Sequence, residues 1–216
     1  MRIIGGEFRS RRLKTLRGLD VRPTPDRLRE TLFDILAGEI EGAVFLDAYA
    51  GTGAVGIEAL SRGAARAIFI EASAAAIRAI NANLAALGLA ERAEVVHGLV
   101  EKRLAQYRAD VVFMDPPYAP EREYRLVLEL LAEHPPTVVV VQHEWRRPLA
   151  AQYGCLERVR VVRQGGNALS FFRPKGVADG AQGPGSPSRT CTGSRACSGE
   201  PAGAGKGLVS GPKPTR

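Results

Sequence analysis

Strand-like and helix-like segments alternate through most of this 216-residue chain, and the alternation restricts the fold more than any other feature. Short apolar runs rich in β-branched residues alternate with stretches that have helical spacing. The runs are residues 44–46, 67–70, 93–96, 110–114 and 137–141, and the helical stretches lie near residues 54–62, 73–87, 99–106 and 121–132. This βα pattern is typical of an open, mostly parallel sheet covered by helices. We therefore predict an α/β fold.

The C-terminal part of the chain departs from this alternation. Residues 159–163 and 168–172 flank Gln164-Gly165-Gly166-Asn167, which predicts a closing antiparallel hairpin. From Gly176 onward the chain is rich in Gly, Pro, Ser and Ala, so it cannot bury enough surface to offset the entropy of ordering. We predict a folded domain over residues 25–175, an N-terminal extension over residues 1–24, and a disordered low-complexity tail over residues 176–216.

Positive charge is concentrated at the N-terminal end. Residues 1–29 contain nine Arg or Lys residues against three acidic ones, a net +6 of the +7 for the whole chain. Residues 1–24 include short apolar and basic runs around glycines, typical of a small hairpin, and Thr24 with Pro25 predicts a helix start. A basic extension predicts contact with a polyanion, and the alternative is an ordinary solvated surface. The candidate RNA-binding residues are Arg2, Arg9, Arg11, Arg12, Arg22, Arg27 and Arg29.

The cysteines and histidines do not indicate a disulfide-rich or zinc-binding protein. The three cysteines are too few for a disulfide framework and lack zinc-ligand spacing, and the three histidines occur singly. We therefore predict no metal site. There is no basic-then-apolar leader and no apolar run of about 18 residues. The sequence predicts a cytoplasmic monomer that does not associate with membranes.

The fourth apolar run ends at Asp115-Pro116-Pro117-Tyr118. The prolines end the strand and have no amide N–H, so carbonyl oxygens there face no competing donors. An exocyclic amine of a nucleobase becomes cationic as it bonds a methyl group, and a fixed carboxylate stabilises that charge most in the transition state. We predict that Asp115 and the Pro116 carbonyl hold the amine hydrogens and that Tyr118 stacks on the base. The alternative is an ordinary proline-rich turn.

A glycine-rich loop follows the first apolar run. Gly51, Gly53 and Gly56 match G-x-G-x-x-G, which lets a helix N-terminus approach a ligand closely. Glu71 ends the second run, where a carboxylate can bind two ribose hydroxyls. These features fit a nicotinamide dinucleotide nearly as well, but Asp47 would repel a pyrophosphate and attract the ammonium group of S-adenosylmethionine. The predicted cofactor-binding residues are Asp47, Tyr49, Gly51, Gly53 and Glu71. A helix cap is the alternative for Glu71, and core packing is the alternative for Tyr49.

Several blocks together are similar to one family. They are Arg22-Pro23-Thr24-Pro25-Asp26-Arg27, Arg29-Glu30-Thr31-Leu32-Phe33, Gly51-Thr52-Gly53, Ala59-Leu60-Ser61-Arg62-Gly63-Ala64 and Asp115-Pro116-Pro117-Tyr118. Residues 1 to about 175 thereby resemble the RsmD family of bacterial 16S rRNA guanine-N2 methyltransferases. The resemblance implies a class I S-adenosylmethionine-dependent methyltransferase fold, Rossmann-like, with a seven-stranded mostly parallel sheet and a small basic N-terminal hairpin. It also implies 16S rRNA, in the small ribosomal subunit or its precursor, as partner, with Asp115 and Tyr118 at the target base.

The sequence departs from the family pattern in two places, and other functions stay open. His97-Gly98-Leu99 stands where many such enzymes place Asp or Asn against the adenine amine, and the tail has no counterpart. Asp-Pro-Pro-Tyr also resembles motifs of DNA adenine-N6 or cytosine-N4 methyltransferases, and Asn-Pro-Pro-Tyr serves protein glutamine methylation. A non-catalytic RNA-binding assembly factor is a further alternative, although intact Asp47, Glu71 and Asp115 argue against it.

Overall fold

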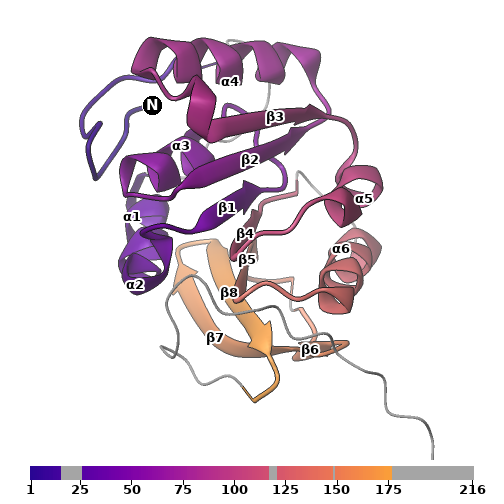
Figure 1. Ribbon diagram of the computed structural model, residues 1–216. Helices are drawn as coiled ribbons and strands as arrows, with labels where there is room; N and C mark the ends of the chain where they lie inside the picture. Colours follow the sequence, from indigo (N-terminus) through magenta and orange to yellow (C-terminus); the bar gives the residue numbers. More distant parts are fainter. Residues whose placement is uncertain (16–25, 117–120, 148, 177–216) are drawn as a thin grey trace, which may run out of the picture.

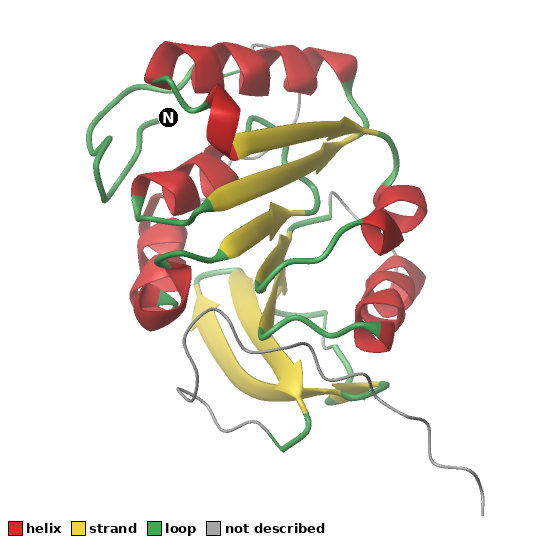
Figure 2. Cartoon of the chain, viewed as in Figure 1, coloured by secondary structure: helices red, strands yellow, loops and turns green. Residues whose placement is uncertain are grey.

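An eight-stranded sheet runs through the centre of the molecule, with helices on both of its faces (Figures 1 and 2). This computed structural model describes residues 1–15, 26–116, 121–147 and 149–176. The strands are β1 (Val44–Asp47), β2 (Arg66–Glu71), β3 (Ala93–His97), β4 (Val111–Met114), β5 (Val138–Glu144), β6 (Gln152–Tyr153), β7 (Leu156–Gln164) and β8 (Asn167–Pro174). The helices are α1 (Asp26–Ile35), α2 (Ala37–Ile40), α3 (Ala54–Ser61), α4 (Ala74–Leu87), α5 (Val100–Arg103) and α6 (Glu121–Glu133), with 3₁₀ turns at Ala90–Arg92 and Leu104–Gln106.

The strand order is β3-β2-β1-β4-β5-β8-β7-β6. Strands β1 to β5 are parallel, whereas β8 pairs antiparallel with β5 and β7 pairs antiparallel with β8. The predicted α/β fold with a mostly parallel sheet is confirmed. The predicted count of seven strands was wrong, because Gln152 and Tyr153 pair with β7 and add β6 as an eighth, two-residue strand. The chain reverses direction across the sheet between β1 and β4, the position at which open α/β sheets bind ligands.

Two apolar layers explain why the central strands are apolar without alternation. On β1 and β4, Phe45 and Phe113 belong to the core beneath α1 and α3, and Leu46 and Val112 belong to the core beneath α5 and α6. Successive strand residues point to opposite faces, so a strand covered on both sides must be apolar at every position. This arrangement leaves the carboxyl ends of the strands as the edge at which polar side chains gather.

The closing hairpin forms as predicted. Strands β7 and β8 join through Gly165-Gly166, and Gln164 pairs with Asn167. Gly165 has φ of 62°, a left-handed conformation that a two-residue hairpin turn requires and that glycine adopts without strain. Since Glu144 of β5 pairs with Asn167, the hairpin turn lies at the carboxyl end of β5.

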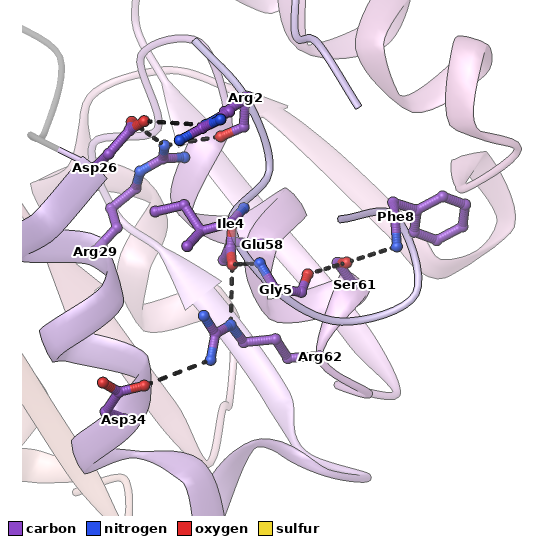
Figure 3. Close-up of polar contacts among 10 residues, drawn as sticks. All are labelled: Arg2, Ile4, Gly5, Phe8, Asp26, Arg29, Asp34, Glu58, Ser61 and Arg62. Atoms are coloured by element: carbon purple, nitrogen blue, oxygen red, sulfur yellow. Dashed lines mark hydrogen bonds and ion pairs between the residues drawn. The ribbon is translucent and has the colours of Figure 1, made fainter. Parts of the chain in front are cut away.

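The N-terminal segment forms a hairpin-like turn that packs against α3 and α4 (Figures 1 and 3). An antiparallel bridge joins Arg2 to Arg12, and Ile3 and Leu13 are buried with apolar residues of α3 and α4. The buried carboxylate of Glu58 on α3 accepts hydrogen bonds from the amides of residues 4 and 5, at 2.8 and 2.7 Å. The predicted N-terminal hairpin is thus bound to the sheet's helical layer.

Two predictions about the fold concern residues that the structure does not describe. Thr24 and Pro25, predicted to start α1, lie outside the described residues, as does the predicted tail from residue 177 onward. The described helices include none with the length and apolarity needed to cross a membrane.

Candidate active site

A cavity of about 370 Å³ opens at the carboxyl ends of β1, β2, β3 and β4. Its wall includes the glycine-rich loop after β1, the end of β2, the segment after β3, the end of β4 and α6. The polar residues that line it include Asp47, Tyr49, Thr52, Glu71, Ser73, Glu101, Asp115 and Glu123. The two predicted sites, for cofactor and for substrate amine, therefore border one cavity.

The glycines of the loop satisfy two steric demands. Gly53 precedes α3 with φ of 75°, in the left-handed region that side chains disfavour. Gly56 packs against β2, and a Cβ atom there would lie 2.3 Å from Cε1 of Phe69, inside van der Waals contact. The loop therefore brings the start of α3 close to the strands and to the cavity.

Asp47 is a buried carboxylate at the base of the cavity, with 1% of its surface exposed. Its Oδ2 accepts a hydrogen bond from the Gly56 amide at 3.0 Å. Burial raises the pKa of Asp47 from 3.8 to about 7; the Gly56 hydrogen bond opposes this shift, and the carboxylates of Asp115 and Glu71 add to it. Because the carboxylate uses an amide in the first turn of α3, it stands where a dinucleotide pyrophosphate would bind, and it suits a cationic ligand instead.

Glu71 connects the glycine-rich loop to the segment between β2 and α4. Its Oε2 accepts from the Gly51 amide and its Oε1 accepts from the Ser73 amide, both at 2.7 Å. The side chain is half-buried and lines the cavity. Glu71 thus bonds the amide of Ser73, which itself caps α4, and it also holds the glycine-rich loop beside the cavity.

The side chain of Tyr49 extends from the loop after β1 to α6. Its hydroxyl donates to Oε1 of Glu123 at 2.9 Å, and burial, with the Glu123 hydrogen bond second, raises the Tyr49 pKa above its ordinary value. The ring lines the cavity while its hydroxyl is held by the helix. Sequence reasoning missed Glu123, because 74 residues separate it from Tyr49 and Glu121 is a second acidic residue in the same turn of α6.

Asp115 is half-buried where β4 ends, and it lines the cavity. Burial raises the pKa of both Asp47 and Tyr124, and the nearby carboxylate of Asp115 adds to each shift. Pro116 is buried beside it. Tyr118, the predicted stacking residue, lies outside the described residues, as does Pro117.

The segment after β3 closes the remaining side of the cavity. The Gly98 amide donates to the Glu71 carbonyl at 3.0 Å, and a nitrogen of the His97 ring lies 3.0 Å from the carbonyl of Ala72. Gly98, Leu99 and Val100 line the cavity, and Leu99 is 47% exposed. An apolar wall therefore stands where related enzymes place Asp or Asn. Met1 also lines the cavity, a position that sequence reasoning missed because nothing local marks it.

The predicted RNA-binding arginines differ in exposure. Arg2, Arg9, Arg11, Arg12 and Arg27 are exposed, and Arg22 lies outside the described residues. The Leu13 amide donates to the Met1 carbonyl, so the bridged Arg2–Arg12 pair adjoins a cavity residue. Two of the exposed arginines, Arg2 and Arg12, therefore adjoin a residue that lines the cavity.

The structure contradicts the prediction that Arg29 contacts RNA. Its side chain is fully buried, and its NH2 group bonds the Asp26 carboxylate at 2.7 Å and the Arg2 carbonyl at 2.9 Å (Figure 3). A buried arginine bonded to these groups joins α1 to the N-terminal hairpin. Helical periodicity alone could have indicated this, because Arg29 follows the buried Leu28 and precedes Leu32 by one turn.

The sequence matches one protein-family model and is similar to a named bacterial protein. A family model described as "Conserved hypothetical protein 95" matches residues 1–173. The chain is 47% identical over 120 residues to ribosomal RNA small subunit methyltransferase D of Escherichia coli strain K12, an alignment that covers 55% of this chain and 60% of that protein.

Solved structures show the same architecture. The Escherichia coli protein yhhF superposes with a TM-score of 0.71 and 34% identity, covering 81% of this chain and 97% of that one. An RNA methyltransferase from Salinibacter ruber, in complex with S-adenosyl-L-homocysteine, superposes with a TM-score of 0.58 over 74% of this chain and 99% of its own. Its 20% identity bears on the fold alone. The chain has the class I S-adenosylmethionine-dependent methyltransferase fold.

Proposed function

Because the chain belongs to the RsmD family, the family also described as "Conserved hypothetical protein 95", we propose that it methylates the exocyclic N2 amine of a guanine in 16S ribosomal RNA. The methyl donor is S-adenosylmethionine. The observation that carries the proposal is the single cavity in which Asp47 and Glu71 stand on the side of the glycine-rich loop and Asp115 stands at the end of β4. The polar site for the methyl donor thereby adjoins the Asp115 carboxylate, which would receive the N2 amine of the guanine.

The residues of the cavity fit the donor by charge. Burial raises the Asp47 pKa, and the carboxylates of Asp115 and Glu71 add to this shift, so a cationic ligand among them relieves an unfavourable interaction. Asp47 would hold the ammonium group, Glu71 the ribose hydroxyls, and the apolar segment at Leu99 the adenine ring. When bound, S-adenosylmethionine supplies an electrophilic methyl group.

The other residues act on the guanine. The Asp115 carboxylate and the Pro116 carbonyl would accept the two amine hydrogens, which directs the nitrogen lone pair toward the methyl group. As the nitrogen becomes cationic, the fixed charge of Asp115 stabilises it. The same carboxylate is placed to accept the proton that the product amine must release. Tyr118 would stack on the extruded base.

RNA would approach through the N-terminal hairpin. The exposed Arg2, Arg9, Arg11 and Arg12 lie on the segment whose Met1 lines the cavity, and the exposed Arg27 lies on α1. Phosphate contacts of this kind position the RNA without reading its sequence. A ribosomal substrate agrees with the cytoplasmic location predicted from the sequence.

Methyl transfer from labelled S-adenosylmethionine tests the proposal directly. The substrates to compare are protein-free 16S rRNA, small ribosomal subunits, duplex DNA and a protein extract, with nucleoside analysis of the product. We expect N2-methylguanosine from rRNA or small subunits. Label in DNA would identify an amino-methyltransferase of DNA, label in protein a glutamine methyltransferase, and RNA binding without transfer an assembly factor, and each would overturn the proposal.

Replacing Glu71 by Ala is expected to weaken S-adenosylmethionine binding by about 1.5 to 3 kcal/mol, the scale of hydrogen bonds to charged groups. The Gly51 and Ser73 amides lose their acceptor, so the melting temperature should also fall. Calorimetric titration measures the affinity. Ser73→Ala is the matched control, because it removes the side-chain cap on the Ala76 amide and leaves the carboxylate in place. Unchanged affinity in Glu71→Ala would contradict the assignment.

Replacing Arg9, Arg11 and Arg12 together by Ala is expected to weaken RNA binding. Loss of ~3 phosphate contacts should flatten the log-log salt dependence by roughly two units. Filter binding over a range of salt concentrations measures the slope, and cofactor affinity should not change. The control with the same change in net charge replaces the exposed Arg78, Arg108 and Arg125. Equal slopes for the two triple variants would show that the hairpin has no special role.

A further inference from the structure

An aromatic side chain is exposed where β5 ends. Trp145 directly follows β5 and is 41% exposed. The guanidinium carbon of Arg163, on β7, lies 4.9 Å from the centre of an indole ring of Trp145, within the range of a cation–π interaction. Aromatic rings and arginine guanidinium planes are the surfaces on which proteins stack unpaired RNA bases.

Backbone hydrogen bonds fix the pair in place. The Trp145 amide donates to the Gly166 carbonyl at 2.8 Å, and the Arg147 amide donates to the Glu144 carbonyl at 3.0 Å. Nε of Arg163 lies 3.3 Å from the Gly165 carbonyl, to which it donates. The turn after β5 and the β7–β8 turn are thus bonded to each other, so a ligand would meet a surface that is already ordered.

The pair lies on the same edge of the sheet as the cavity. Met114 pairs with Val141, so Asp115 is level with Gln142 of the neighbouring parallel strand. Trp145 comes three residues later, roughly 10 Å further along at about 3.3 Å per residue. That length corresponds to about three stacked nucleotides of one strand at about 3.4 Å each. A strand that delivers a base to Asp115 can therefore reach Trp145.

The charge around the pair favours a polyanion over a protein partner. Arg146 is exposed in the same turn as Trp145, and Val161, on the same side of β7 as Arg163, is 40% exposed. Glu144 is an exposed carboxylate at the end of β5. Two exposed arginines beside one glutamate give a positive, partly apolar surface, the combination with which proteins bind single-stranded nucleic acid.

We propose that Trp145 and Arg163 form a stacking surface for an unpaired base of the RNA substrate, a few nucleotides from the one that is methylated. The inference rests on the proposed function, since it takes RNA as the substrate of the same sheet edge. It adds a second contact region, supplied by β5 and the β7–β8 turn, to the basic N-terminal hairpin.

Trp145 is the only tryptophan in the sequence, so its fluorescence reports on this surface alone. Titration of the full chain with a short unstructured single-stranded RNA is expected to quench the emission, and protein-free 16S rRNA should do the same. An abasic strand of the same length, which offers phosphates without bases, should leave the emission unchanged. RNA binding without quenching would overturn the proposal, and quenching by intact small subunits alone would assign the surface to a protein partner and also overturn it.

Substitutions give a second readout. Trp145→Ala is expected to lower the affinity for labelled single-stranded RNA by about 5- to 150-fold, whereas Trp145→Phe, which keeps a ring, should stay close to the wild type. Val159→Ala is the control, because Val159 is 39% exposed and lies on β7 within the bulge between Arg158 and Arg160, away from the turn. Equal affinity for Trp145→Ala and Val159→Ala would overturn the proposal.

The failure of this inference can be distinguished from the failure of the proposed function. Fluorescence and RNA affinity require no methyl transfer. If the wild type methylates rRNA and Trp145→Ala does so with an unchanged KM for RNA, only the stacking surface is rejected. If the wild type methylates no RNA, the proposed function fails, and quenching by RNA still decides whether bases stack on Trp145.

Discussion

Replacing Asp115 by Ala is expected to lower kcat by about 100-fold or more, the cost of deleting one fixed partner of the transition state, with cofactor affinity largely unchanged. The substitution leaves only the Pro116 carbonyl to hold the amine. Asp115→Asn loses the charge but keeps an acceptor oxygen, so it should retain measurable turnover. Single-turnover methylation of small subunits compares the two variants with the wild type.

The structure sharpens this expectation, because Asp115 lies in the wall of the same cavity as Asp47. Removing either carboxylate reduces the repulsion on the other, so the Asp115 variants should lower the Asp47 pKa and should not weaken cofactor binding. Calorimetric titration of Asp115→Ala with S-adenosylmethionine is the control measurement. Full turnover in Asp115→Ala would exclude this residue from the mechanism.

The second large effect is expected at Asp47. Asp47→Asn should weaken S-adenosylmethionine binding by about 2 to 5 kcal/mol, because the ligand's cationic group would be left without its buried partner. Asparagine can still accept the hydrogen bond from the Gly56 amide, so the glycine-rich loop should keep its conformation. RNA affinity, measured by filter binding, should remain at the wild-type value.

The raised pKa of Asp47 makes cofactor binding depend on pH. The charged carboxylate binds the cation, and its pKa of about 7 in the free protein means that affinity should rise from pH 6 to pH 8. Near pH 7, binding should release protons, which calorimetry detects in buffers of different ionisation enthalpy. Asp47→Asn should show neither effect at this residue. If the affinity of Asp47→Asn for S-adenosylmethionine depends on pH as in the wild type, the group that titrates is not Asp47.

The same residue should reduce the stability of the ligand-free protein at high pH. Its pKa is higher in the folded state than the ordinary value of 3.8, so the folded state binds more protons between about pH 4 and pH 7. Its contribution to stability therefore falls as the pH rises through that window and stays low above it. Asp47→Asn should consequently melt at a higher temperature than the wild type at pH 8. A lower melting temperature would contradict the burial argument.

Most of the fold followed from local patterns. Largely apolar runs of three to five residues predicted β1 to β5, because the buried parallel strands at the centre of a sheet are apolar on both faces. The turn at Gly165-Gly166 predicted the closing hairpin. The two-residue strand β6 has no such pattern, since Gln152 and Tyr153 pair only because β7 passes beside them.

The sequence alone determined the elements of the site, and the tertiary structure decided how they are combined. Asp47 and Glu71 end strands, Asp115 directly follows one, and the glycines lie between β1 and the first turn of α3, so local patterns placed them at one edge of the sheet. The partners that define their roles are distant in sequence: Tyr49 with Glu123, Glu71 with Gly51, and Arg29 with the Arg2 carbonyl. Local periodicity carries no information on such pairs, because they form only when the sheet brings separate elements together. Burial, which turned Arg29 from a predicted RNA contact into a link between α1 and the N-terminal hairpin and which raised the Asp47 pKa, is likewise a property of the assembled fold.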